Sequence, residues 1–164
     1  MKVQFYVFGK LKTQGLPEAA AYYQKALASQ TPVEIFELKS MSVTEKSEAV
    51  RAKNQSLEET LLFDKIEANS TARRWVIFLD ERGKNLRTLE WAKLIQEKNE
   101  SSVSHLCFCI GSSLGFSDSA RKKANQLLSL GAQTLNHELI RVVLYEQVFR
   151  AFAVNSGHPY HNEG

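Results

Sequence analysis

The sequence predicts a single-domain α/β sandwich with a mostly parallel sheet. Short runs rich in β-branched and aromatic residues alternate with longer segments in which apolar residues recur at helical spacing. The runs at 75–79 and 106–110 are apolar throughout, as is typical of strands buried on both faces of a parallel sheet. No linker, repeat or low-complexity segment interrupts the 164 residues, a length that can bury one substantial core.

The first half of the chain predicts two strands and two helices. Pro17 suits the first turn of a helix, where the missing amide hydrogen of proline costs nothing. Thr44 is expected to open a longer helix that contains almost no helix-breaking residue. The expected elements are strands at 2–8 and 33–38 and helices at 17–29 and 44–69. The apolar sides of these helices are expected to consist of Tyr22, Tyr23, Ala26 and Leu27, and of Leu57, Leu61, Leu62 and Ile66.

The second half continues the alternation. The charged segment 80–84 is expected to be a loop at the carboxyl end of the strand 75–79. Asp118 is expected to cap a helix that reaches about Leu128. The remaining expected elements are a helix at 86–98, the strand at 106–110, a loop or short strand at 130–135, and a final helix at 137–154.

This topology predicts where a ligand binds. Ligands of parallel sheets bind beyond the carboxyl ends of the strands. In this chain those ends lie after Leu79, after Ile110 and near 130–135. The segments 111–115 and 130–135 are glycine-bearing loops after short hydrophobic runs, and glycine lets a backbone approach a ligand closely. Three loops that are distant in sequence are therefore expected to form one cleft for a small polar ligand.

The composition is that of an ordinary soluble protein, with 43% hydrophobic and 24% charged residues. No apolar run approaches the roughly 20 residues that span a bilayer, and the short N-terminal apolar stretch lacks a cleavage site. We therefore expect a cytoplasmic protein. The net charge of +3 permits nucleic-acid binding without establishing it. Cys107 and Cys109, two apart in one strand, are expected to be buried reduced thiols.

Two other chemistries fit the residues poorly. The loop 111–115 matches G-x-S-x-G with Ser113 at its centre, but a hydrolase also needs a downstream acid followed by a histidine, and no clear set is present. His137, His158 and His161 match no common spacing of metal ligands, so no metal is expected.

Arg141 and Arg150 interrupt an otherwise apolar final helix. Such charges are costly unless they are paired or face a polar cleft. Glu138 precedes Arg141 by three residues and Glu146 precedes Arg150 by four, and both spacings favour ion pairs. Contact with a phosphate group is the alternative, and both can be true. The helix also carries an apolar stripe that is expected to lie partly at a two-fold interface, namely Leu139, Val142, Val143, Val148, Phe149 and Phe152.

The C-terminal third resembles a known family. The segment 130–152, with Glu-Gln-x-x-Arg-Ala at 146–151, and the later His-Pro-Tyr-His at 158–161 resemble the RlmH-type ribosomal RNA large-subunit methyltransferases. These are small, knotted enzymes of the SPOUT class. The resemblance covers essentially the whole chain, including 79–84 and the dipeptide Ile110-Gly111.

The resemblance implies a fold, a reaction and partners. It implies a trefoil knot over approximately 75–155, a substrate tail at 156–164, and a homodimer that completes each active site. The implied reaction transfers a methyl group from S-adenosylmethionine to N3 of a pseudouridine in large-subunit (23S-type) rRNA of the assembled ribosome, without a membrane or metal. The implied cofactor contacts are Leu79, Gly111, Leu130, Gly131, Ala132, Gln133, Thr134 and Leu135.

Methyl transfer to such a base requires alignment and removal of the N3 proton. His161 and Glu146 are the candidate proton-handling groups, and Tyr160 is grouped with them as catalytic. The residues expected to hold the base and phosphates are Arg150, Arg141 and His158. Glu146 has an alternative role in pairing with Arg150, and Tyr160 has one in packing the tail.

Besides Asn162, which stands where the family tail often has a basic residue after the last His, the chain departs from the family pattern at three places. It has Gly-Ser at 111–112 in place of Gly-Gly, Ser-Leu-Gly at 129–131 in place of Ser-Leu-Ser, and Asn136 in place of proline. The first and last of these are the only support for a non-catalytic ribosome-binding homologue with a degenerate cofactor loop. A tRNA methyltransferase is a weaker alternative, because the short chain has no appended RNA-binding domain.

Overall fold

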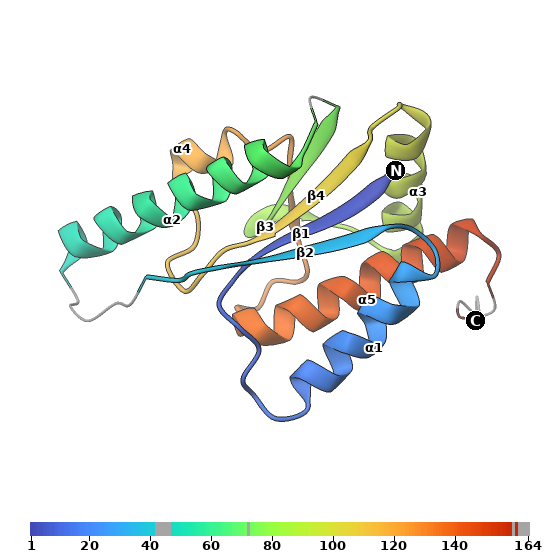
Figure 1. Ribbon diagram of the computed structural model, residues 1–164, viewed down its shortest axis with the longest axis horizontal. Helices are drawn as coiled ribbons and strands as arrows, with labels where there is room; N and C mark the ends of the chain where they lie inside the picture. Colours follow the sequence, from blue (N-terminus) through green and yellow to red (C-terminus); the bar gives the residue numbers. More distant parts are fainter. Residues whose placement is uncertain (42–46, 72, 159, 161–164) are drawn as a thin grey trace.

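Five parallel strands form one sheet with the order β2-β1-β4-β3-β5 (Figure 1). The structure is a computed structural model that describes residues 1–41, 47–71, 73–158 and 160. The strands are β1 (Lys2–Phe8), β2 (Val33–Leu38), β3 (Arg74–Asn85), β4 (His105–Ile110) and β5 (Gln126–Ser129). The helices are α1 (Leu16–Ala28), α2 (Glu48–Asn69), α3 (Thr88–Glu100), α4 (Asp118–Arg121) and α5 (His137–Asn155). The predicted α/β class is confirmed.

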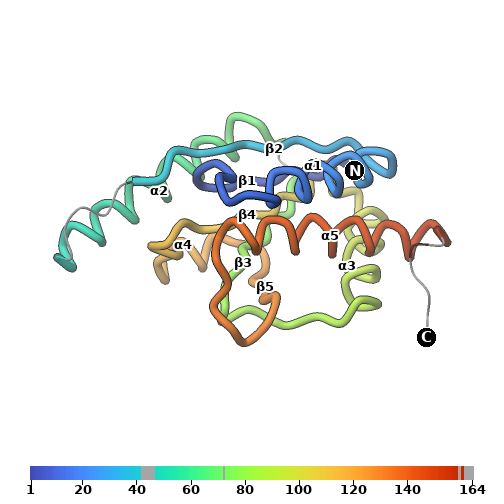
Figure 2. Tube along the Cα trace, turned by 90° about the horizontal axis from the view of Figure 1, so that it is seen from below, coloured from blue at the N-terminus to red at the C-terminus, as the bar shows by residue number. Residues whose placement is uncertain are grey.

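Helices cover both faces of the sheet. One face carries α1, α3 and α5, with α5 packed against the other two, and the opposite face carries α2 and α4 (Figures 1 and 2). Because side chains alternate across a strand, Phe5 and Phe108 enter the first core while Phe78 and Cys109 enter the second. The central strands are therefore buried on both faces, as their apolar sequences predict.

The two cysteines are buried and free, as predicted. Both belong to the core beneath α2 and α4. Burial raises the pKa of the Cys107 thiol to about 11, so this thiol stays protonated at neutral pH. Its Sγ lies 3.4 Å from Oε1 of the fully buried Gln4, whose Nε2 donates to the carbonyl oxygen of Asn69 at the end of α2.

The prediction of a loop at 80–84 is wrong, because these residues belong to the second half of β3. The pairing between β3 and β5 is interrupted after Leu79 and resumes at Lys84, so that both residues pair with Leu128. This irregularity accommodates the charged residues that follow the buried half of the strand. The sequence gives no alternating pattern there, so the extension depends on the partner strand.

The helix predicted from Asp118 to Leu128 is wrong over most of its length. Only Asp118–Arg121 is helical, and Ser117 caps it by accepting a hydrogen bond from the amide of Ala120. Residues 126–129 instead form β5 beside β3. Tertiary pairing with β3 overrides the local helical preference of this segment.

Three residues predicted on apolar helix faces are exposed: Tyr22 by 62%, Leu57 by 44% and Leu61 by 39%. Tyr22 is two positions from the buried Ala20, about 200° around α1, and therefore faces solvent. The inner side of α2 is marked by Leu62 and Ile66. Thr44 lies outside the described residues. None of the helices in the described part of the chain is both long enough and apolar enough to cross a membrane.

Gly83 is expected to tolerate no side chain. A β-carbon there would lie 2.5 Å from the backbone nitrogen and carbonyl carbon of Leu128, which forces β3 and β5 apart. We expect Gly83→Ala to lower the free energy of unfolding by about 1–3 kcal/mol, measured by urea denaturation. The exposed neighbour Lys84 provides the control, since Lys84→Ala should change stability little. Equal stability of Gly83→Ala and the wild type would contradict this close approach.

Candidate active site

The middle of β3 and the carboxyl ends of β4 and β5 surround a cavity of about 500 Å³. Its walls are formed by the residues after Leu79, by the loop 110–116, by the segment 129–136 and by the first turn of α5. The structure thus brings together the three predicted segments. A cavity of this size with mixed apolar and polar walls suits a small-molecule ligand.

Most residues that the family resemblance assigns to the cofactor lie in this cavity wall. Ala132 does not line the cavity and is exposed. The role of all these assigned residues in cofactor binding stays a prediction. The assigned residues that line the cavity are Leu79, Gly111, Leu130, Gly131, Gln133, Thr134 and Leu135.

Local hydrogen bonds shape the segment 129–136. The hydroxyl of Ser129 donates to the carbonyl of Gly131 at 2.6 Å and accepts from its amide at 3.2 Å. Gly131 has φ +150°, and a β-carbon there would lie 3.1 Å from Oε1 of Gln133, so glycine suits this turn. Asn136 caps α5 by accepting from the amide of Glu138 at 2.8 Å.

The departures at Asn136 and Ser112 fit the backbone. Asn136 has φ −59°, a value that proline also adopts. Asparagine therefore keeps the backbone of the family pattern and adds a cap. Ser112 has a negative φ, and its hydroxyl donates to Oε2 of Glu58 on α2 at 2.5 Å.

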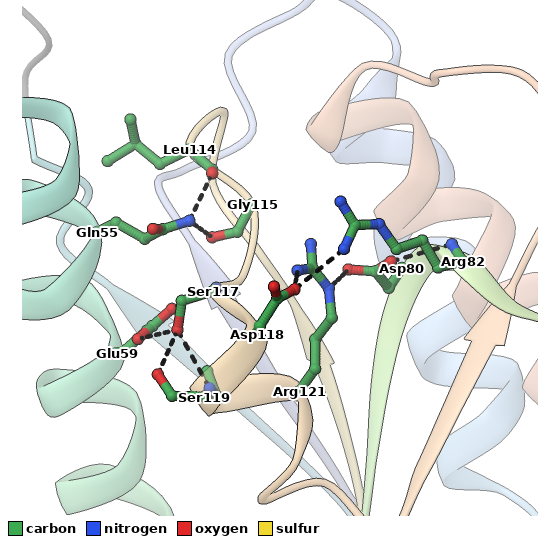
Figure 3. A network of polar contacts seen from close by, with 11 residues as sticks. Gln55, Glu59, Asp80, Arg82, Leu114, Gly115, Ser117, Asp118, Ser119 and Arg121 are labelled. Carbon is green, nitrogen blue, oxygen red and sulfur yellow. Dashed lines mark hydrogen bonds and ion pairs between the residues drawn. The ribbon is translucent and has the colours of Figure 1, made fainter. Parts of the chain in front are cut away.

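An ion-pair network holds β3 to α4 beside the cavity (Figure 3). Oδ2 of Asp80, whose side chain is 6% exposed, accepts from Nε of Arg121 at 2.7 Å. Arg121 and Arg82 both donate to Oδ1 of Asp118, at 2.8 and 3.0 Å. Burial alone would lower the pKa of Arg121, but its bonds to the two carboxylates outweigh burial and raise it. Sequence reasoning missed this network, although Asp80 directly follows the buried half of β3.

The predicted pair between Arg141 and Glu138 does not form. Arg141 is 2% exposed, and its Nη1 bonds to Oε1 of Glu37 at 2.9 Å while its Nη2 donates to the carbonyl oxygen of Gly9 at 2.7 Å. A guanidinium enclosed by the ends of β1 and β2 anchors α5 and is inaccessible to an RNA phosphate in this subunit. We therefore assign Arg141 a structural role in place of the predicted substrate contact.

The predicted pair between Glu146 and Arg150 is confirmed. Nε of Arg150 donates to Oε1 of Glu146 at 2.8 Å, and Nη2 forms a second, shorter contact with the same oxygen. The hydroxyl of Tyr160 lies 3.3 Å from this oxygen, and its ring packs against Phe149 and beneath the guanidinium of Arg150. Burial raises the pKa of the Tyr160 hydroxyl, so Tyr160 remains a hydrogen-bond donor at neutral pH.

His158 extends this cluster. His158 is exposed, and its Nδ1 lies 3.2 Å from the amide of Tyr160. His161 lies outside the described residues. Within 1–41, 47–71, 73–158 and 160, no three His, Cys, Asp or Glu side chains are grouped so as to hold a metal ion.

The cavity and this cluster lie at opposite ends of α5. His137 lines the cavity and begins α5, whereas Arg150 lies near its other end. At 1.5 Å per residue the two positions are about 20 Å apart along the helix axis. The chain leaves α5 after Asn155, at the end opposite the first turn that lines the cavity (Figure 1). One subunit therefore does not bring its own cluster to its own cavity.

A parallel sheet with a cavity at its strand ends is typical of a ligand-binding α/β protein. Comparison with known protein families identifies the family within this class. Residues 1–161 match the family described as "Predicted SPOUT methyltransferase". The chain belongs to this family, which confirms the resemblance seen in the sequence.

Similar proteins match along the whole chain. Proteins called "Ribosomal RNA large subunit methyltransferase H" are 38% identical in Lactobacillus acidophilus, 37% in Streptococcus agalactiae and 35% in Streptococcus gordonii, each over 98% of this chain and 99% of the relative. A solved structure described as a probable methylase family protein from Haemophilus influenzae is 14% identical, with a TM-score of 0.54 over 96% of this chain and 67% of its own. This last similarity supports the fold alone.

Glu138 anchors the first turn of α5 through a carboxylate, and we expect the stability that this contact contributes to be lost in acid. The amides of Thr13 and Lys12 donate to its Oε2 at 2.9 and 2.6 Å and hold the pKa of this carboxyl below its ordinary value. The resulting stability is present above pH 4.5, the ordinary pKa, and is lost as the pH falls through the lowered folded-state pKa.

We therefore expect Glu138→Gln to lower the urea midpoint at pH 7. The difference in urea midpoint between the variant and the wild type should narrow below about pH 4.5. It should disappear once the Glu138 carboxyl of the wild type is protonated in both the folded and the unfolded state. Urea denaturation across this pH range measures it. A difference that does not change with pH would contradict the assignment.

Proposed function

We propose that this protein is an S-adenosylmethionine-dependent methyltransferase that modifies N3 of a pseudouridine in large-subunit rRNA. Its substrate is the assembled ribosome in the cytoplasm. The observation that carries the proposal is the convergence of residues 79–81 of β3 with the segments after β4 and β5 on one cavity, in a chain of the SPOUT methyltransferase family. The full-length relatives named as rRNA large-subunit methyltransferases support the choice of substrate.

The cavity suits the proposed cofactor. Apolar side chains such as Leu79, Ile110 and Ile140 line it and match an adenine ring and the methylenes of methionine. Hydroxyls of Ser113 and Thr134, together with the main-chain groups of their loops, offer partners for the ribose and the amino-acid end. When bound, S-adenosylmethionine supplies a methyl group on a sulfonium, which is already a strong electrophile.

The remaining tasks fall to the tail cluster. The base must be aligned and its N3 proton accepted. We assign proton acceptance to His161 and alignment to Arg150 and Tyr160, with His158 beside them. The carboxylate of Glu146 is occupied by Arg150 and Tyr160, so its proposed role is to orient these two groups.

The proposed enzyme is a homodimer in which the tail of one subunit completes the cavity of the other. The separation of about 20 Å along α5 supports this arrangement, because the two halves of the site do not meet within one chain. The apolar stripe on α5 gives weaker support than expected, since Val142, Val148 and Phe149 are buried in their own subunit while Leu139 is 41% exposed. We further propose the trefoil knot over approximately 75–155 and the substrate tail at 156–164.

The non-catalytic alternative loses its support. It depended on Ser112 and Asn136, and both side chains fit the backbone and form hydrogen bonds. A large preformed partner such as the ribosome also suits a chain with a net charge of only +3, which alone attracts free RNA weakly.

Ribosomes lacking the modification should gain one methyl group on one pseudouridine. We expect this when they are incubated with the purified protein and S-adenosylmethionine, and mass mapping of the rRNA measures it. The control is Gly111→Val, because a β-carbon at Gly111 already lies 3.4 Å from Gly115 and Phe116 and the larger side chain narrows the cavity. An unmethylated product with the wild type, or no calorimetric heat with millimolar S-adenosylmethionine, would contradict the proposal.

Mixed dimers should restore activity lost in each parent. Gly111→Val removes the cofactor cavity, whereas Arg150→Ala removes the tail cluster, so each homodimer is expected to be inactive. After equal mixing and subunit exchange, half of the dimers combine the two, and each of these regains one of two sites. Activity should therefore reach about a quarter of the wild-type value. Persistent inactivity after verified exchange would show that each site is built within one chain.

A further inference from the structure

One face of α2 holds the loop 112–117 from outside the cavity. Nε2 of Gln55 donates to the carbonyl oxygen of Leu114 at 3.0 Å (Figure 3). One turn later, the carboxylate of Glu59 accepts from the amide and the hydroxyl of Ser117 at 2.6 and 2.9 Å. The loop therefore depends on contacts from a distant helix as well as on its own turn.

Glu58 makes the innermost of these contacts. Glu58 is buried, with 3% of its surface exposed. Oε2 accepts from the hydroxyl of Ser112 at 2.5 Å, and Oε1 accepts from the amide of Met41 at 2.7 Å. The oxygen of the Ser112 hydroxyl in turn accepts from the amide of Leu114 at 3.0 Å. One carboxylate thus joins the segment after β2, helix α2 and the loop after β4.

We propose that Glu58 is a positioning residue for the methyl donor and acts through Ser112. Ser112 and Leu114 line the cavity, so a hydroxyl that binds Glu58 on one side and the Leu114 amide on the other sets the shape of the wall. A preorganised wall reduces the cost of ordering the loop on binding. The inference rests on the proposed function, because it concerns the same cofactor cavity.

The neighbouring Glu59 provides a matched control. Both carboxylates accept two hydrogen bonds, from Ser112 and Met41 in one case and from Ser117 in the other. Glutamine has one acceptor oxygen and can replace only one of these bonds. Ser112 lines the cavity and Ser117 does not. The same substitution at the two positions therefore separates a cofactor effect from a general loss of loop contacts.

Calorimetric titration of the full-length protein with S-adenosylmethionine tests the inference, with thermal unfolding of each variant measured in parallel. Glu58→Gln and Ser112→Ala should each raise the Kd by up to about tenfold, because the loop that the lost charge-assisted hydrogen bond held must then be ordered on binding. The double variant should be no weaker than either single variant, because the two residues act as one unit. Glu59→Gln should lower the melting temperature while leaving the Kd within about twofold.

The outcomes are distinguishable. An unchanged Kd in Glu58→Gln, or an equal rise in Glu59→Gln, would overturn the positioning role while leaving the proposed function intact. Absence of binding by the wild type would overturn the proposed function and this inference with it. If Glu58→Gln does not fold, Ser112→Ala decides alone, since it removes one hydroxyl and with it only the contacts to Glu58 and to the amide of Leu114.

Discussion

The buried guanidinium of Arg141 fixes α5 against the sheet, and α5 connects every part of the candidate site. Its acceptors, Glu37 and the carbonyl of Gly9, lie at the carboxyl ends of β2 and β1. A charge in such a position is costly without these partners, so α5 cannot slide along the sheet without losing them. Glu138 adds a second anchor one turn earlier. The first turn of α5 is thereby held beside the cavity as part of its wall.

A helix fixed in this way also determines where the tail can act. From its anchored end, α5 extends over nineteen residues to Asn155. Glu146 lies at its midpoint and Arg150 beyond it, and Tyr160 contacts both from the segment that follows the helix. Their mutual contacts leave the cluster preformed, which lowers the cost of ordering it against a base. A preformed cluster that is distant from its own cavity is more useful to a second subunit than to the first. The proposed two-chain site therefore depends on the rigidity of this one helix.

The sequence predicts those features that depend on local pattern. The continuous apolar runs of β3 and β4 identify buried strands, and the strand-end rule then predicts one cleft from three separate loops. Features that depend on distant partners are missed. Residues 126–129 form a strand because they pair with β3. Arg141 pairs with Glu37, and not with Glu138 three residues away in the sequence, because the end of β2 lies against it. Glu58 and Ser112 are 54 positions apart, and no spacing rule connects them.

The departures from the family pattern show what the cavity requires. Its wall is formed largely by loop residues, so a substitution there must keep the backbone angle at its position. Asn136 keeps an angle that proline favours, and Ser112 avoids the left-handed region that would require glycine. Each new side chain then forms a hydrogen bond directed away from the cavity, to the amide of Glu138 or to Glu58. Sequence change at such a site is tolerated when the backbone is kept and the added polar group finds a partner.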